Sequence, residues 1–241
     1  IAPHTGNRMN PQPLLRLLSL LLFVAFSPVS DCFADKSKEE LEERITANLT
    51  RLAERQQDLR WAIPAEVIAQ AKGIVILHSV KAGFIVGAEV GNGIAIVRKA
   101  DGTWGAPAFV ALVNRSFGLQ AGADESVTIL CLMTEQSLKV IHHGANVEVG
   151  IDLEAAAGPL GAGGEITSTT LQKPVLVYTS EKGAFAGASI EAGALIGDKK
   201  KNETVYGEKM DAILFSGQAQ PTPAGLRLIE ALNGFAGQAA R

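Results

Sequence analysis

The sequence predicts an α+β fold, in which N-terminal and C-terminal helices cover a glycine-rich, strongly curved antiparallel sheet that can approach a barrel. Apolar residues recur at every second position in the middle of the chain, as at Ile94 and Ile96, which is the pattern of half-buried strands. Gly91-Asn92-Gly93 and Asp101-Gly102 accept the positive φ that tight turns require. We therefore expect strands on both sides of Gly91-Asn92-Gly93 and a third strand that begins at Trp104.

The composition is that of a globular protein with a substantial core. The 241 residues are 47% hydrophobic and 20% charged, which is enough apolar material for one sizeable domain. The 25 glycines and the aromatic content of only 5% indicate close backbone packing and many turns. The net charge of −3 argues against a nucleic-acid partner held by bulk charge.

The N-terminal part of the chain reads as a cleavable leader. After Met9 and Arg16 comes an apolar run over residues 17–26, and Cys32-Phe33-Ala34 fits the site at which a signal peptidase cuts. We therefore divide the chain into upstream residues and a signal peptide over 1–34 and a single domain over 35–241. This interpretation predicts export, to the periplasm or the medium. A lipid anchor on Cys32 is the disfavoured alternative, since Asp31 occupies a position where a lipobox has a small residue.

The exported domain begins with a helical segment over about 37–72. Ser37 and Glu40 form a capping box, and Pro64 fits the start of a second, short helix over 65–71. The first helix extends to about Arg60 and carries an apolar stripe on one side, formed by Leu41, Ile45, Leu49 and Leu52. We favour a stripe that packs on the domain, because the opposite face mixes charges of both signs, unlike an interfacial helix; the alternative is a stripe that contacts a membrane or a partner.

Further elements follow from local patterns. Strands are predicted over residues 74–77, 126–133, 145–153 and 174–179, with short helices over 134–140 and 208–214. Thr222-Pro223 begins a last helix that ends near Gly234. A glycine-rich segment recurs weakly at 83–88, 117–123 and 183–188, which indicates either a duplication or similar hairpins.

No residue pattern predicts catalysis. The glycines of 158–164 lack the Gly-Lys-Ser/Thr ending of a phosphate loop, and no Gly-x-Ser-x-Gly elbow is found. His142 and His143 are adjacent, so on a strand they point to opposite faces and cannot easily share a metal. Cys131 lies in an apolar run and has no partner for a disulfide after cleavage. We therefore predict no enzyme, no catalytic residue, no metal and no cofactor.

Basic residues are the candidates for a binding site. Each cation near an anionic lipid surface contributes about 1 kcal/mol, whereas a solvated loop is the other interpretation of the lysine run 199–201. The residues proposed to contact lipid are Lys81, Arg98, Lys99, Arg115, Lys199, Lys200 and Lys201.

An ordered set of motifs resembles the SYLF domain, also called the Ysc84 actin-binding domain, over residues 65–235. The motifs are Lys81-x-Gly83, Gly87-Ala88, Gly91-x-Gly93, Arg98, Asp101-Gly102-x-Trp104-x-x-Pro107, Gly118-x-Gln120-x-Gly122, Gly158-Pro159, Tyr178, Gly183, Gly187, Asn202, Tyr206-Gly207 and the Pro221/Pro223 stretch. Gly105 stands where the family usually has serine. In eukaryotic relatives a basic amphipathic segment precedes the domain, and here that region holds Glu39, Glu40, Glu42 and Glu43.

The resemblance implies a non-enzymatic module that binds phosphoinositides or other anionic lipids and, in fungal members, actin filaments. Together with the leader, it identifies the chain as a bacterial exported member that binds lipid or membrane in the cell envelope. The alternative is a structural or protein-binding module that uses the amphipathic helix over 37–60. Neither reading includes nucleic acid, and the sequence predicts no oligomeric state.

Overall fold

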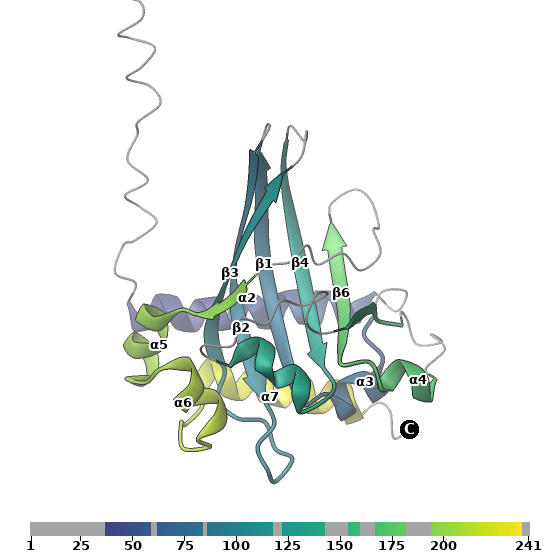
Figure 1. Cartoon of the computed structure of the whole chain (residues 1–241). Coiled ribbons are helices and arrows are strands. Elements are labelled where there is room, and N and C mark those ends of the chain that lie inside the picture. The colour runs from purple at the N-terminus through teal and green to yellow at the C-terminus, as the bar shows by residue number, and fades with distance from the viewer. Residues whose placement is uncertain are drawn as a thin grey trace, which may run out of the picture. The chain divides into compact units, whose positions relative to one another are not determined.

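The computed structural model describes residues 37–58, 62–83, 86–117, 122–142, 154–159, 167–181 and 194–237 (Figure 1). The predicted leader, the predicted strand 145–153, and the signature glycines Gly183 and Gly187 lie outside these residues. None of the described helices is both long enough and apolar enough to cross a bilayer.

The centre of the fold is a mixed sheet of seven strands in the order β5-β6-β4-β1-β2-β3-β7. The pairing of β5 with β6 is parallel and the other pairings are antiparallel. The strands are β1 (Gly73–Gly83), β2 (Val86–Val97), β3 (Ala108–Phe117), β4 (Gly122–Leu132), β5 (Ala155–Ala157), β6 (Val175–Glu181) and β7 (Ala194–Gly197).

The α+β class with flanking helices is confirmed, but the prediction of a wholly antiparallel, strongly curved or barrel-like sheet is wrong. In the described part of the chain β5 and β7 are separate edges, and the sheet is open. At Gly91 and Gly93, two of the glycines behind this prediction, the lack of a side chain instead makes room for neighbouring strands. A Cβ at Gly93, for example, would lie 1.9 Å from the carbonyl oxygen of Ile76 on β1.

The strand pattern also corrects the predicted hairpin. Gly91 and Gly93 pair with Ser79 and Leu77 inside the β1–β2 ladder, so Gly91-Asn92-Gly93 lies within one long strand and does not form a turn. The turn at Asp101-Gly102 is confirmed, since Gly102 has a φ of 83° and Arg98 pairs with Trp104 across it. The alternation of apolar residues over 86–97 fits one continuous strand. Glycine occurs inside a strand where another backbone approaches closely.

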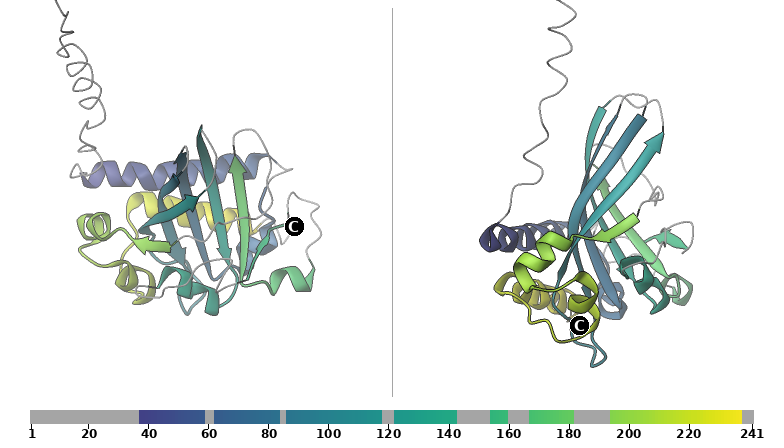
Figure 2. Two further views of the ribbon diagram at one scale, coloured as in Figure 1. Left: turned by 45° about the horizontal axis from the view of Figure 1, so that its top comes forward. Right: turned by 60° about the vertical axis from the view of Figure 1, so that its left-hand side comes forward.

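Alternate residues of the strands face two separate hydrophobic cores, which is the expected consequence of the period-two pattern. Ile74, Ile76, Ile94 and Ile96 belong to one core, and Val75, Leu77, Ala95 and Val97 belong to the other. The first core is shared with α2 (Lys38–Gln57), α3 (Ala65–Gln70) and α7 (Pro223–Ala236), and α2 and α7 lie together on that side of the sheet (Figure 2). The second core includes residues of η2 (Gln136–Ile141) and α6 (Met210–Phe215).

The predicted packing of the first helix is confirmed. Leu41, Ile45 and Leu52 of α2 are fully buried in the first core, and the side chain of Ser37 caps the helix by accepting a hydrogen bond from the backbone N–H of Glu40. Thr222 caps α7 in the same way, through the N–H of Gly225. The remaining helices are α4 (Ser168–Leu171) and α5 (Lys199–Tyr206).

Candidate binding surfaces

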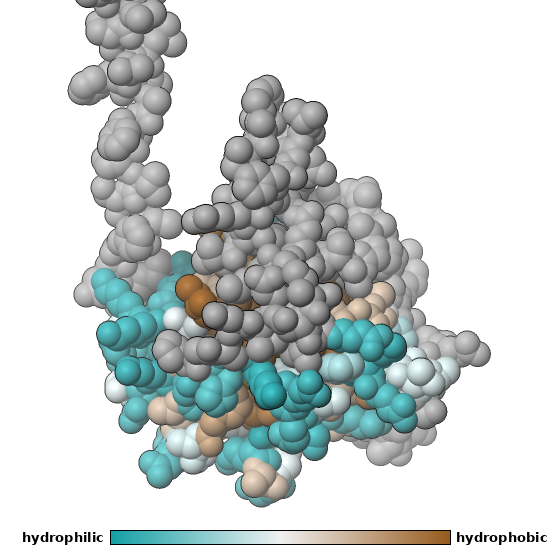
Figure 3. Space-filling model, viewed as in Figure 1, coloured by the Kyte–Doolittle hydropathy of each residue, from teal (hydrophilic) through white to brown (hydrophobic). Residues whose placement is uncertain are grey.

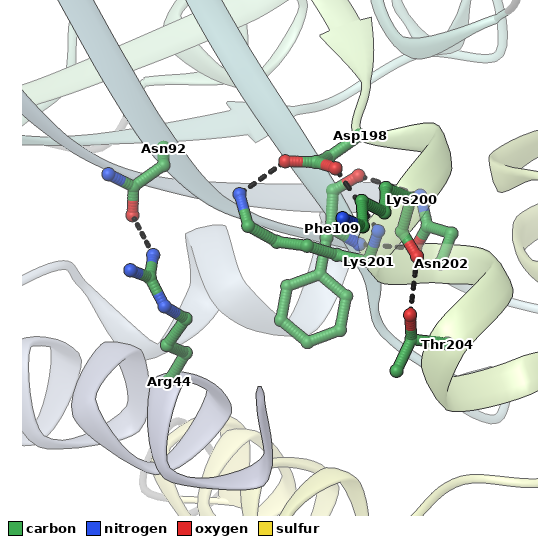
Figure 4. A network of polar contacts seen from close by, with 8 residues as sticks. All are labelled: Arg44, Asn92, Phe109, Asp198, Lys200, Lys201, Asn202 and Thr204. Atoms are coloured by element: carbon green, nitrogen blue, oxygen red, sulfur yellow. Dashed lines mark hydrogen bonds and ion pairs between the residues drawn. The ribbon is translucent and has the colours of Figure 1, made fainter. Parts of the chain in front are cut away.

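The lysine run, predicted as a loop, is instead the first turn of α5 (Figure 4). The side chain of Asp198 caps this helix by accepting a hydrogen bond from the backbone N–H of Lys201 and pairs with the Lys201 ammonium. The buried amide of Asn202 accepts from the N–H of Phe109 at 2.7 Å and donates to its C=O at 2.9 Å. Asn202 therefore continues the β3 ladder in place of a strand and fastens α5 to the sheet.

The three lysines do not form a free cationic patch. Lys199 lies 3.9 Å from Glu203, and Lys201 pairs with Asp198. The backbone carbonyl of Lys200 accepts a hydrogen bond from Thr204. Lys199 and Lys200 are exposed, and the described surface around α5 is strongly hydrophilic (Figure 3). The run is therefore a solvated helix end whose charge is partly neutralised.

Arg98 is held inside the fold. Its guanidinium donates hydrogen bonds to the carbonyls of Ala71, Ile68, Ala69 and Gly102, at 2.8 to 3.3 Å. It also lies 4.0 Å from the centroid of the Trp104 ring, and burial lowers the pKa of Arg98. Lys99 is exposed in the adjoining turn. The structure thus gives Arg98 a structural role, and lipid contact by either residue stays a prediction.

Lys81 and Arg115 lie at the opposite end of the long strands. In the ladder, Lys81 is the register partner of Glu89 and of Asp124, and Arg115 is the register partner of Ala88. The predicted basic residues therefore occupy three separate places: the turn after β2, the far end of the sheet and the start of α5. The structure does not bring them together into one site.

The far end of β1–β4 is a surface that the predicted basic residues do not define. No charged residue occurs in 82–88 or in 116–123. The described strand ends of these segments meet in register, as Val86 with Phe117 and Gly83 with both Gly87 and Gly122. These strands project beyond α2 (Figures 1 and 2). The recurring glycine-rich segments were the available signal, because two of the three surround this end; the third, 183–188, lies outside the described residues.

Two exposed valines continue this surface toward the body of the domain. Val80 is 41% exposed and Val90 is 60% exposed, and they are register partners, so they share one face of the sheet. Asn92, two residues along β2, accepts a hydrogen bond from Arg44 of α2 at 3.2 Å. The two valines therefore lie just beyond the part of this face that α2 covers.

A second feature, which the predicted site residues do not include, lies beneath the end of α2. The guanidinium of Arg55 is 5.5 Å from the centroid of the Tyr178 ring on β6. Burial raises the pKa of the Tyr178 hydroxyl, raises that of the neighbouring Cys131 thiol to about 12 and lowers that of Arg55. Helical periodicity in the sequence indicates this placement. Asn48 and Arg55 occur at the same helical spacing as the apolar residues on the buried side of α2, which are Leu41, Ile45 and Leu52.

Several signature residues have structural roles. Gly158 leaves room for Tyr178, since a Cβ there would lie 2.1 Å from the Cζ of the ring. Gly207 ends α5 with a φ of 71°, a conformation that favours glycine. The ring of Trp104 makes a cation–π contact with the guanidinium of Arg98, and Pro107 packs against Gly225 at the start of α7. Within the described residues, no three histidine, cysteine, aspartate or glutamate side chains gather to hold a metal.

The structure defines an α+β domain in which helices pack on both faces of a seven-stranded sheet. A family model for Ysc84, described as "Las17-binding protein actin regulator", matches residues 114–235, about half of the chain. The chain belongs to this Ysc84 family, so the resemblance seen in the motifs is confirmed. The family's description names binding and regulation and no reaction.

Curated relatives agree with this assignment. The SH3 domain-containing YSC84-like protein 1 of Rattus norvegicus is 34% identical over 203 residues, which are 83% of this chain and 59% of the relative. LAS seventeen-binding protein 3 of Saccharomyces cerevisiae is 32% identical over 166 residues, 67% of this chain and 36% of the relative. Protein YSC84 of the same yeast is 31% identical over 175 residues, 70% of this chain and 37% of the relative. The chain thus spans about three-fifths of the length of the mammalian relative. These relatives are eukaryotic, and the comparisons give no support to a bacterial, exported origin.

Proposed function

We propose that the chain is a non-catalytic module that binds anionic membranes through the far end of its sheet. The observation that carries this proposal is the uncharged end of β1–β4, which projects past the helices (Figure 1). Val86 and Phe117 are register partners there, and Val80 and Val90 leave apolar side chains exposed next to it. Removal of apolar surface from water drives such a contact, at roughly 25 cal/mol per Å².

The charged residues next to this end of the sheet determine how membrane binding should depend on salt. Lys81 and Arg115 would lie near lipid headgroups, where each cation contributes about 1 kcal/mol. Glu89 and Asp124 are the register partners of Lys81, and Arg115 lies in the adjacent row as the partner of Ala88, so the net charge of these two rows is small. We therefore expect binding that persists at moderate salt, in contrast to binding through the lysines of α5, which screening would abolish.

Co-sedimentation with vesicles tests the proposal. The full chain is mixed with phosphatidylcholine vesicles that contain or lack phosphatidylglycerol, at low and at moderate salt. Val86→Asp and Phe117→Asp should each abolish pelleting, because a carboxylate is costly to bury in hydrocarbon. Leu226→Asp is the matched control, since Leu226 is 56% exposed on α7, away from the β1–β4 end, and it should pellet like the wild type. A wild-type chain that stays in solution at both salt concentrations would refute the proposal.

A variant of the lysine run separates the two lipid hypotheses. Replacement of both Lys199 and Lys200 by glutamine should leave pelleting at moderate salt unchanged if the end of the sheet makes the contact. A complete loss of pelleting in this variant, with Val86→Asp unaffected, would transfer the site to α5. The location of the membrane in the cell envelope is part of the proposal and rests on the leader predicted over residues 1–34.

A protein partner is the second candidate function, favoured by the family's description as an actin regulator that binds Las17. The apolar stripe of α2 is buried, so a partner would contact the outer face, where Glu39, Glu43 and Glu54 are exposed. Co-sedimentation with actin filaments tests this candidate. Binding that Glu43→Lys with Glu54→Lys removes, and that Val86→Asp leaves intact, would support the partner role; no binding by the wild type would exclude filaments as the partner.

A further inference from the structure

The Arg55 corner, formed by Arg55, Tyr178 and Cys131, contains hydrogen-bond donors that have no acceptor among the described residues. The Nε and Nη2 atoms of Arg55 are buried, and neither has a hydrogen-bond acceptor among the residues that the structure describes. The hydroxyl of Tyr178, a residue only 1% exposed, has no partner in the same part of the chain. An unmet buried polar group costs about 1–3 kcal/mol, and more when it is charged.

The two unmet nitrogens of Arg55 are the ones that form a fork. In a guanidinium, Nε–H and the Nη2–H on the same edge point in nearly parallel directions, at a spacing that matches two oxygens of a carboxylate or phosphate. Lysine cannot reproduce this geometry, because its ammonium is a point donor. The two unpaired donors of Arg55 therefore match the spacing of two oxygens of an oxyanion.

In the described part of the chain, the charge of Arg55 also has no carboxylate as a partner. The groups that act on the charge of Arg55 are Tyr178 and Cys131. Both are uncharged at neutral pH, and burial raises the pKa of each further. The hydrogen bonds and ion pairs described for this part of the chain include no carboxylate that receives the Arg55 fork. A buried charge without a partner is strongly destabilising, so the corner favours a ligand that supplies one negative charge.

We propose that Arg55 and Tyr178 form an internal site for an oxyanion, a carboxylate or phosphate group that accepts both N–H groups of the Arg55 fork and the Tyr178 O–H. The ring of Tyr178 supports the guanidinium from one side. Around the ring the site adjoins the apolar core that contains Ile129 and Leu176. The site is separate from the far end of the sheet, so the test of anion binding does not depend on the test of membrane binding.

Calorimetric titration of the full chain tests the site. Sodium phosphate and sodium octanoate are titrated separately, with the ionic strength held constant by sodium chloride, so that a free phosphate and a carboxylate with a hydrocarbon chain are distinguished. We expect one of the two to bind one-to-one. Arg55→Gln should weaken that binding by about tenfold or more, since a bidentate charged pair is lost.

Three variants make the result specific. Arg55→Lys keeps the charge but lacks the fork, and Tyr178→Phe keeps the ring but lacks the donor, so each should weaken binding by several-fold. Circular dichroism shows whether Arg55→Gln folds. If it does not, the Arg55→Lys and Tyr178→Phe variants provide the test. Arg51→Gln, one turn earlier on α2, should bind like the wild type. The proposal is overturned if neither anion binds the wild type, or if the variants at Arg55 and Tyr178 bind as tightly as Arg51→Gln.

Discussion

Two arginines of this domain occupy similar surroundings and differ in one respect. Arg98 and Arg55 are both partly buried, both lie against an aromatic ring, and burial lowers the pKa of both. Arg98 donates to four backbone carbonyls, whereas two donors of Arg55 have no acceptor among the described residues. The difference teaches that unmet hydrogen bonds, and not basic residue type, mark the arginine that is available to a ligand.

The supply of backbone acceptors explains the difference. Arg98 faces the end of α3, where Ile68, Ala69 and Ala71 present carbonyls, and the last carbonyls of a helix lack partners within the helix. Arg55 faces β6, where Tyr178 and Val177 pair with Ile129 and Leu130 of β4. Carbonyls in a ladder are already occupied. An arginine over a sheet therefore needs an acceptor from elsewhere.

The largest expected effect comes from replacing each arginine by methionine. Arg98→Met should lower the free energy of unfolding by about 3 kcal/mol, because hydrogen bonds to a charged group are lost and helix-end carbonyls are left unmet. Arg55→Met should change it by less than about 1 kcal/mol, or raise it, since an unpartnered buried charge is replaced by apolar atoms. Urea unfolding of both variants, in chloride buffer without phosphate, makes the comparison.

Equal losses in the two variants would contradict this contrast, because Arg55 would then be as fully bonded as Arg98. Arg98→Lys is a useful intermediate: it keeps the charge but cannot reach several carbonyls at once. Its loss of stability should fall between those of the wild type and Arg98→Met.

A smaller effect is expected at the glycine that makes room for the Tyr178 ring. In Gly158→Ala the new Cβ would lie 2.1 Å from Cζ and 2.4 Å from the hydroxyl of Tyr178, so the ring must shift, at a cost of about 2 kcal/mol. Gly207→Ala is the matched control. Its Cβ would meet nothing within 4 Å, and only the φ of 71° opposes it, at a cost of about 1 kcal/mol.

Thermal unfolding of both variants gives the order of the two losses. If Gly158→Ala is as stable as the wild type, the Tyr178 ring is not held in place beneath Arg55, and the support proposed for the guanidinium is lost with it. Reduced anion binding by folded Gly158→Ala, together with normal binding by Gly207→Ala, would connect the glycine to the oxyanion site.

Local patterns were sufficient for the elements whose signals are contained in a few neighbouring residues. Ser37 and Thr222 mark true helix starts, and apolar runs locate β1, β4 and β6. Patterns failed where distant residues decide the structure. The helix at 199–206 is fastened to the sheet by the amide of Asn202 on Phe109, far away in the sequence, so its lysines read as a loop.

The candidate sites show the same division. Basic residues can be found in a sequence, but whether a guanidinium already has acceptors depends on the fold around it. The sequence predicts Arg98 as a ligand residue, but its guanidinium donates to backbone carbonyls. Arg55 is not among the predicted residues, and its Nε and Nη2 have no acceptor in the described part of the chain. The absence of charge in 82–88 and 116–123 could be read from the sequence, but that these segments meet at one end follows only from the pairing of the strands.

The smallest effect at neutral pH concerns Cys131, whose reactivity measures how closed the Arg55 corner is. Burial raises the pKa of this thiol from 9.0 to about 12, so in the folded protein it stays protonated while the thiol of the unfolded chain ionises above pH 9. The contribution of Cys131 to stability is therefore complete below about pH 9 and is lost progressively between pH 9 and 12. Cys131→Ala should flatten the fall of stability in that window and cost about 1 kcal/mol at pH 7.

Ellman's reagent should label the wild-type thiol only at the rate of unfolding, because a buried thiol is inert. Rapid labelling of the folded protein would show that solvent reaches Cys131, and the nearby Arg55 would then be compensated by water, which removes the need for an oxyanion.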